Sequence, residues 1–135
     1  MNRRTIPAVP HEVRLPPHPA SVGRARRFVL DELRTMGIAD PNAAAELVVS
    51  ELVTNAVMHA GTPITVRVER WGAGARVEVA DGSHSMPGLR AVSVASSSGR
   101  GLTLVEHFAT AWGADRTDDG KVVWFLVGDP AKAAG

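Results

Sequence analysis

The sequence has 135 residues, of which 44% are hydrophobic and 21% are charged, with a formal net charge of +1 and no cysteine. This length suits one domain whose core buries about two thirds of the surface of the unfolded chain, and the composition excludes wholesale disorder. The small net charge excludes a general electrostatic attraction to nucleic acid or membranes, and the absence of cysteine excludes disulfides, thiolate metal sites and cysteine nucleophiles.

The first segment of the chain is polar and contains several prolines. We predict a disordered tail over residues 1–10, followed by an edge strand from His11 to Leu15 that ends at Pro16-Pro17. Further prolines, and not an apolar run, follow Arg3-Arg4, so no export signal is expected. No segment approaches the ~20 apolar residues of a membrane helix. We therefore expect a cytoplasmic protein that contacts neither a membrane nor nucleic acid directly.

Two helices are predicted next. The first opens at Pro19-Ala20-Ser21 and ends at Gly37, a residue type that commonly ends helices. The second follows Asp40-Pro41, the expected N-cap and first-turn proline, and runs to about Ala60. Each helix carries an apolar side that should pack on a core. These sides consist of Val22, Ala25, Phe28, Val29, Leu33 and Met36 in the first helix, and of Val48, Val49, Leu52, Val53, Ala56, Val57 and Ala60 in the second.

Beyond Gly61 the hydrophobic pattern changes from a helical period to strict alternation, which predicts strands. Residues 64–69 and a strand ending at Asp81 form a β-hairpin around the turn Gly72-Ala73-Gly74. The small residues from Gly82 to Ser98 predict a mobile loop.

A third helix is predicted from Gly99 through Thr110, followed by two strands near residues 111–116 and 121–127. The turn between these strands has the Asp-Gly chemistry of hairpins. Helices on one face of a mostly antiparallel, mixed β-sheet make a two-layer α+β sandwich, which is the predicted fold class. We expect one domain over residues 11–128 and a C-terminal tail over residues 129–135.

Three polar residues interrupt the apolar second helix at intervals of four. Glu51, Asn55 and His59 therefore lie along one side of the helix and can address one cleft. Asn55 offers a hard amide oxygen suited to Mg²⁺, and Glu51 can take a proton from a nucleophile. The alternative for a single Glu or Asn is a solvated helix edge, and His59 can simply complement the helix dipole.

Two later segments carry further chemistry. Asp81 leaves an apolar strand and can accept a hydrogen bond from an exocyclic amine such as that of adenine, although a turn-capping aspartate is the alternative. The segment Gly99-Arg100-Gly101-Leu102 opens a helix, and such an N-terminus presents unpaired N–H groups that suit phosphate.

Together these residues resemble the GHKL superfamily of ATP-binding domains, shared by histidine kinases, Hsp90, gyrase and MutL. Within it, the chain is most similar to stand-alone anti-sigma-factor serine kinases of the RsbW type. ELVTNAVMHA resembles the family's N box, DGSHSMP its G1 box and GRGLTLV its G2 box. The resemblance spans roughly residues 16–127 and implies a Bergerat-type ATP-binding fold. Ser83 and Ser85 replace two usual glycines of the G1 box, and Val122 stands where the family commonly has a threonine.

The resemblance also implies a role for each site residue. Asn55 would be the ligand of Mg²⁺, Glu51 the general base, and Asp81 the acceptor for the adenine amine, with Gly82 beside it. The residues that would cradle the phosphates are Gly99, Arg100, Gly101 and Leu102.

The implied function is that of an ATP- and magnesium-dependent regulator. It would be an anti-sigma-factor-like protein-serine kinase that phosphorylates a serine of an antagonist partner and sequesters a sigma factor, and the resemblance further suggests a homodimer. The alternative is an ATP-gated interaction module without transferase activity. Glu51 favours the kinase, whereas Ser83, Ser85 and Val122 leave room for the module.

Overall fold

The computed structural model describes residues 11–40, 43–84 and 112–128, and all statements about the fold refer to these residues. The predicted tails and the predicted helix from Gly99 to Thr110 lie outside them. The described elements are β1 (His11–Leu15), α1 (Ala20–Met36), α2 (Ala44–His59), β2 (Ile64–Trp71), β3 (Gly74–Asp81), β4 (Trp112–Thr117) and β5 (Gly120–Val127).

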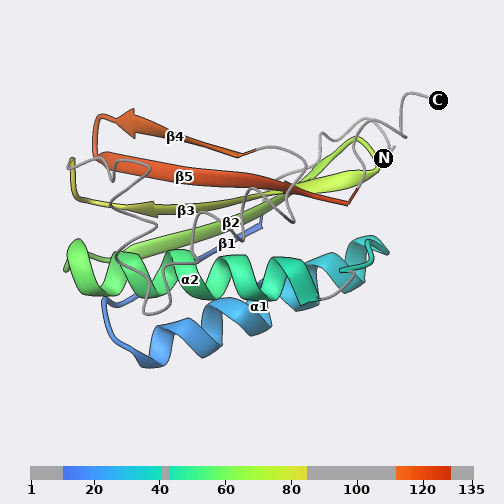
Figure 1. Ribbon diagram of the computed structural model, residues 1–135, viewed down its shortest axis with the longest axis horizontal. Helices are drawn as coiled ribbons and strands as arrows, with labels where there is room; N and C mark the ends of the chain where they lie inside the picture. Colours follow the sequence, from blue (N-terminus) through green and yellow to red (C-terminus); the bar gives the residue numbers. More distant parts are fainter. Residues whose placement is uncertain (1–10, 41–42, 85–111, 129–135) are drawn as a thin grey trace, which may run out of the picture.

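The strands form one five-stranded sheet in the order β1-β2-β3-β5-β4, and every neighbouring pair is antiparallel. Both helices cover the same face of this sheet (Figure 1). The prediction of a two-layer α+β sandwich is therefore confirmed. Both predicted hairpins are also present, and β1 is an edge strand, as its flanking prolines indicated. In the described part of the chain, neither helix is long and apolar enough to cross a membrane.

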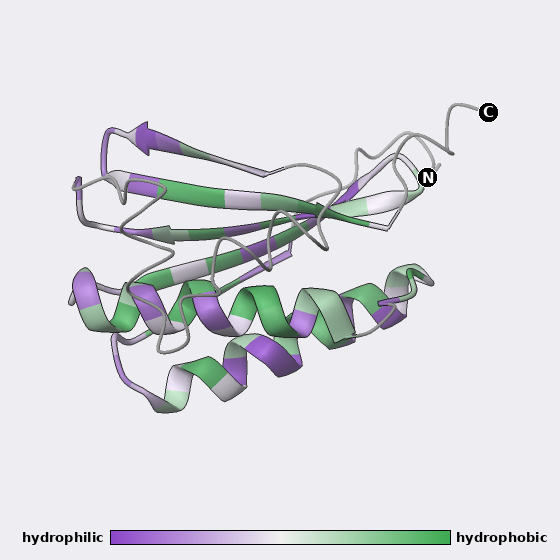
Figure 2. Ribbon diagram, viewed as in Figure 1, coloured by the Kyte–Doolittle hydropathy of each residue, from purple (hydrophilic) through white to green (hydrophobic). Residues whose placement is uncertain are grey.

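The core lies between the sheet and the helices. β2 places Ile64, Val66 and Val68 there, as the alternating pattern predicts, and β3 adds Val77 and Val79. Figure 2 shows that α2 is hydrophobic over most of its length, whereas α1 has a hydrophilic side. The buried apolar residues of the helices are Ala25, Val29 and Leu33 from α1, and Ala45, Val48, Val49, Leu52, Val53 and Ala56 from α2. The predicted apolar sides of both helices thus face the core.

The two helix ends predicted from single residues differ in outcome. α1 ends at Gly37 in the left-handed conformation, with φ of 72°, as predicted. α2 begins at Ala44, later than the predicted start, so Asp40 is not its N-cap residue. The Asp40 carboxylate nevertheless accepts hydrogen bonds from the N–H groups of Ala45 at 2.7 Å and Glu46 at 3.3 Å. Asp40 therefore caps the first turn from outside the helix.

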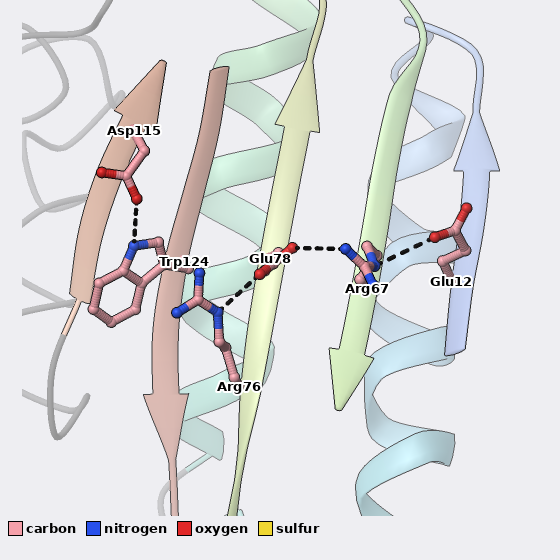
Figure 3. A network of polar contacts seen from close by, with 6 residues as sticks. All are labelled: Glu12, Arg67, Arg76, Glu78, Asp115 and Trp124. Atoms are coloured by element: carbon pink, nitrogen blue, oxygen red, sulfur yellow. Dashed lines mark hydrogen bonds and ion pairs between the residues drawn. The ribbon is translucent and has the colours of Figure 1, made fainter. Parts of the chain in front are cut away.

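The face of the sheet that is turned away from the helices carries a row of polar side chains (Figure 3). The register places one residue of each strand in this row, namely Glu12, Arg67, Glu78, Trp124 and Gly113. Arg67 lies 3.3 Å from Glu12 and 3.5 Å from Glu78. Because Glu12 and Arg67 have side chains 57% and 39% exposed, their ion pair contributes at most about 1 kcal/mol.

The better shielded part of this row lies on the central strands. The Arg76 guanidinium binds the Glu78 carboxylate at 2.8 Å and stacks over the Trp124 ring, 4.5 Å from its centroid. The indole Nε1–H of Trp124 donates to Asp115 on β4 at 3.2 Å. Trp124 therefore lies across the neighbouring strand, and Gly113 leaves the space that it needs.

Gly113→Ala tests this packing directly. A Cβ atom at Gly113 would lie 2.5 Å from Cζ2 of Trp124, so the indole must move away from Arg76 and Asp115. We expect the free energy of unfolding to fall by about 1–3 kcal/mol, measured by urea denaturation, because overpacking forces side chains out of their preferred positions.

Gly23→Ala is the matched control, since it makes the same chemical change in α1. No atom lies closer than 3.6 Å to a Cβ atom placed there, and alanine favours helix, so we expect a gain of about 0.5–1 kcal/mol. A Gly113→Ala variant as stable as the wild type would contradict the packing of Trp124 over β4.

Candidate functional site

The side of α2 that carries the predicted polar residues contains one buried amide. Both polar side-chain atoms of Asn55, Oδ1 and Nδ2, are shielded from solvent and have no hydrogen-bond partner among the described residues. Glu51, one turn earlier, is half-buried and forms no hydrogen bond or ion pair within the described ranges. His59 is exposed and occupies the last turn of the helix. Glu51 and Asn55 therefore share one helical side, as predicted.

The unpaired amide of Asn55 is unusual for a folded protein. Buried polar groups are almost always hydrogen-bonded, and leaving one unpaired costs about 1–3 kcal/mol. Such a residue is typical of a position that a ligand completes. Its Oδ1 is the hard oxygen that Mg²⁺ prefers, and Mg²⁺ usually takes few protein ligands and completes its shell with phosphates and water. The chemistry of Asn55 therefore fits a metal that a bound phosphate also coordinates. The described residues contain no cluster of three or more acidic, histidine or cysteine side chains that could hold a metal ion.

Asp81 lies at the end of β3 and continues the inward side of the strand after Val77 and Val79. Its side chain is only 5% exposed. The Oδ1 atom accepts hydrogen bonds from the backbone N–H of Ser83 at 2.9 Å and from Nζ of Lys121 at 2.9 Å. The turn-capping contact considered from the sequence is therefore present, together with an ion pair that was not predicted.

The segment after Asp81 is fixed to the loop that follows α2. The backbone N–H of Gly82 donates to Oγ1 of Thr62 at 2.7 Å, three residues beyond the end of α2 at His59. Figure 1 shows that β3 and α2 end at the same end of the molecule. The structure thus brings Asp81 and Gly82 to the end of the sheet where the C-terminal half of α2 lies.

The next residue, His84, is bound by β4 and by the turn between β4 and β5. The ring Nε2 of His84 contacts the carbonyl oxygen of Asp118 at 3.1 Å, and Nε of Arg116 donates to the His84 carbonyl at 3.4 Å. Ser83 does not have a positive φ, so serine at this usual glycine position causes no strain. Ser85 and the predicted phosphate segment from Gly99 to Leu102 lie outside the described residues.

Sequence reasoning missed Lys121. In the register of β3 with β5, Lys121 is the direct partner of Asp81, and its side chain is 10% exposed. The available signal was a charged residue that opens an otherwise apolar strand, directly after Gly120. That signal does not reveal which strand lies alongside, so it does not identify Asp81 as the partner.

The chain matches the model of a known protein family. The family model described as the histidine kinase-like ATPase domain matches residues 15–127, which is most of the 135-residue chain. No curated protein matches the sequence. The matched range contains α2, Asp81 and the segment from Gly99 to Leu102.

Asn55→Leu tests whether the amide is kept for a ligand at the expense of stability. Leucine has a similar shape but no polar atoms, so the variant should be more stable than the wild type by about 1–3 kcal/mol when no ligand is added. Urea denaturation without nucleotide or metal measures the difference.

Thr54→Val is the control, because it replaces a polar hydroxyl with a methyl group of similar size at the neighbouring, half-buried position of α2. Threonine and valine have similar helix propensities, so a change of less than about 0.5 kcal/mol is expected. If Asn55→Leu destabilises the protein, the amide has a structural partner and the ligand assignment loses its support.

Proposed function

The chain belongs to the histidine kinase-like ATPase family, whose domain binds ATP, and we propose that it is an ATP- and magnesium-dependent protein-serine kinase of the anti-sigma-factor type. The observation that carries the proposal is a pair of residues on α2. Within the described residues, Asn55 offers a buried amide without a hydrogen-bond partner, and Glu51, one turn away, offers a carboxylate without a hydrogen bond or ion pair. Phosphoryl transfer uses a metal ion that neutralises charge on the phosphate and a base that orients or deprotonates the nucleophile, and these are the two roles that we assign to Asn55 and Glu51.

ATP would be bound at its adenine by one part of the site and at its phosphates by another. The Asp81 carboxylate accepts a hydrogen bond from the adenine amine, and its burial makes this contact selective. The segment from Gly99 to Leu102 receives the phosphates through its backbone N–H groups. Asn55 holds Mg²⁺, which when bound neutralises negative charge on the phosphates.

Glu51 is the proposed general base. A half-buried carboxylate that forms no hydrogen bond or ion pair within the described residues is free to accept the proton of an incoming hydroxyl. Positions 51 and 55 differ by about one helical turn, so a base at Glu51 can act on a group that reaches the phosphate bound near Asn55. The hydroxyl would belong to a serine of a partner protein.

The partners follow from the anti-sigma-factor assignment. We propose that the protein phosphorylates a serine of a small antagonist domain and that it binds and sequesters a sigma factor as a cytoplasmic, homodimeric regulator. The balanced net charge of +1 supports a protein partner over nucleic acid, because it provides no strong positive field.

Glu51→Gln separates phosphoryl transfer from ATP binding. The substitution keeps the shape of the side chain but removes the base, so label transfer from radioactive ATP to a partner serine should drop by about 10²-fold or more. ATP affinity, measured by isothermal titration with Mg²⁺, should stay within about two-fold of the wild type, because Glu51 does not contact the nucleotide in this scheme.

Glu46→Gln is the matched control, an identical change five residues earlier on α2 at a carboxylate that lies 3.8 Å from Arg26. It should leave transfer unchanged. Wild-type transfer by Glu51→Gln would show that Glu51 is not the base. If wild type binds ATP and ATP changes its affinity for a partner, but no serine is labelled, the protein is an ATP-gated interaction module and not a kinase.

A further inference from the structure

The Asp81–Lys121 ion pair stands where the proposed function places the adenine base. The two residues are direct partners in the antiparallel register of β3 and β5, so both side chains project from the same face of the sheet. Phe125 lies four residues after Lys121 on β5, so its side chain projects from the same face. Phe125 is fully buried, which identifies this face as the one covered by the helices. The ion pair is therefore built into the border of the core.

Among the described residues, a single carboxylate oxygen of Asp81 accepts hydrogen bonds. Oδ1 accepts both described hydrogen bonds, from Ser83 and from Lys121, each at 2.9 Å. Oδ2 has no hydrogen-bond partner in the part of the chain that the structure describes. The protein thus presents an acceptor, Oδ2, and a neighbouring donor, the ammonium of Lys121, at the same place.

The backbone around the pair keeps these two groups together. A Cβ atom at Gly120 would lie 2.0 Å from the carbonyl oxygen of Asp81, so only glycine allows β5 to begin this close to the end of β3. The same Cβ atom would lie 2.7 Å from the backbone of Gly82, the residue that follows Asp81. The close approach positions Lys121 beside the carboxylate and leaves no side chain from these two glycines over it.

We propose that Lys121 is a second base-reading residue, whose ammonium donates to ring nitrogen N1 of adenine while Asp81 accepts from the neighbouring exocyclic amine. The proposal rests on the proposed function, in that it requires adenine to bind at Asp81. The amine donor and the N1 acceptor are adjacent on one edge of adenine, and they match an adjacent acceptor and donor on the protein.

Burial makes this match decisive for specificity. The side chains of Asp81 and Lys121 are 5% and 10% exposed, so a ligand edge that lacks a partner leaves a polar group unpaired away from water. Sites of this kind discriminate strongly against analogues that lack one hydrogen-bonding atom. An adenine nucleotide without the N1 acceptor should therefore bind less well, although it keeps the amine and the phosphates.

The test compares ATP with 1-deaza-ATP, in which a C–H group replaces N1. Isothermal titration with Mg²⁺ should show that the wild-type protein binds ATP about 10-fold to 100-fold more tightly, as expected for a hydrogen bond from a charged donor. In Lys121→Met the affinity ratio of the two nucleotides should fall to about two-fold or less. Arg14→Met, which removes a positive charge from the edge strand β1, should keep the wild-type ratio.

The outcomes separate this inference from the proposed function. Equal binding of the two nucleotides by wild type, or an unchanged ratio in Lys121→Met, overturns the role of Lys121 while ATP binding stands. If wild type binds neither nucleotide, adenine recognition at Asp81 is wrong, and the inference falls with it. If Lys121→Met does not fold, Lys121→Gln replaces it, and the ratio should still fall because a neutral amide donates a weaker hydrogen bond than an ammonium.

Discussion

The pairing of β3 with β5 is the interaction on which the rest of the structure depends. β3 belongs to the first hairpin and β5 to the second, and their antiparallel ladder runs from Ala75 opposite Val127 to Asp81 opposite Lys121. This pairing joins two hairpins that are remote in sequence into one sheet. Because side chains of opposed residues share a face, the same register aligns Val77 with Phe125 in the core and Glu78 with Trp124 on the open face.

The two faces of the sheet have different roles. The inner face is apolar and supplies the hydrophobic burial that holds both helices, whereas the outer face is covered by a polar row that runs from Glu12 to Asp115 (Figure 3). Exposed ion pairs contribute little, so most of the stability comes from the inner face. The outer row mainly fixes the positions of long side chains such as Arg76 and Trp124 relative to the strands.

The candidate site lies where this apolar inner face ends, and polar groups there break the usual rules of burial. The side-chain amide of Asn55 is buried without a hydrogen-bond partner among the described residues, and the Asp81–Lys121 pair is almost fully removed from solvent. Buried charges are costly unless they are paired, and an orphaned amide is destabilising. Departures of this kind are expected at functional sites, and among the described residues these two lie on α2 and at the end of β3, where the candidate site was predicted.

The sequence by itself determined the local structure, because periodicity and turn chemistry act over a few residues. It predicted the apolar sides of α1 and α2, both hairpins, the helix end at Gly37, and Glu51 and Asn55 on one side of α2. It misplaced the start of α2, because Asp40 caps the first turn from outside the helix. Only the tertiary structure decided that β5 lies beside β3 and so sets Lys121 against Asp81, since the choice of strand neighbours depends on packing between distant segments.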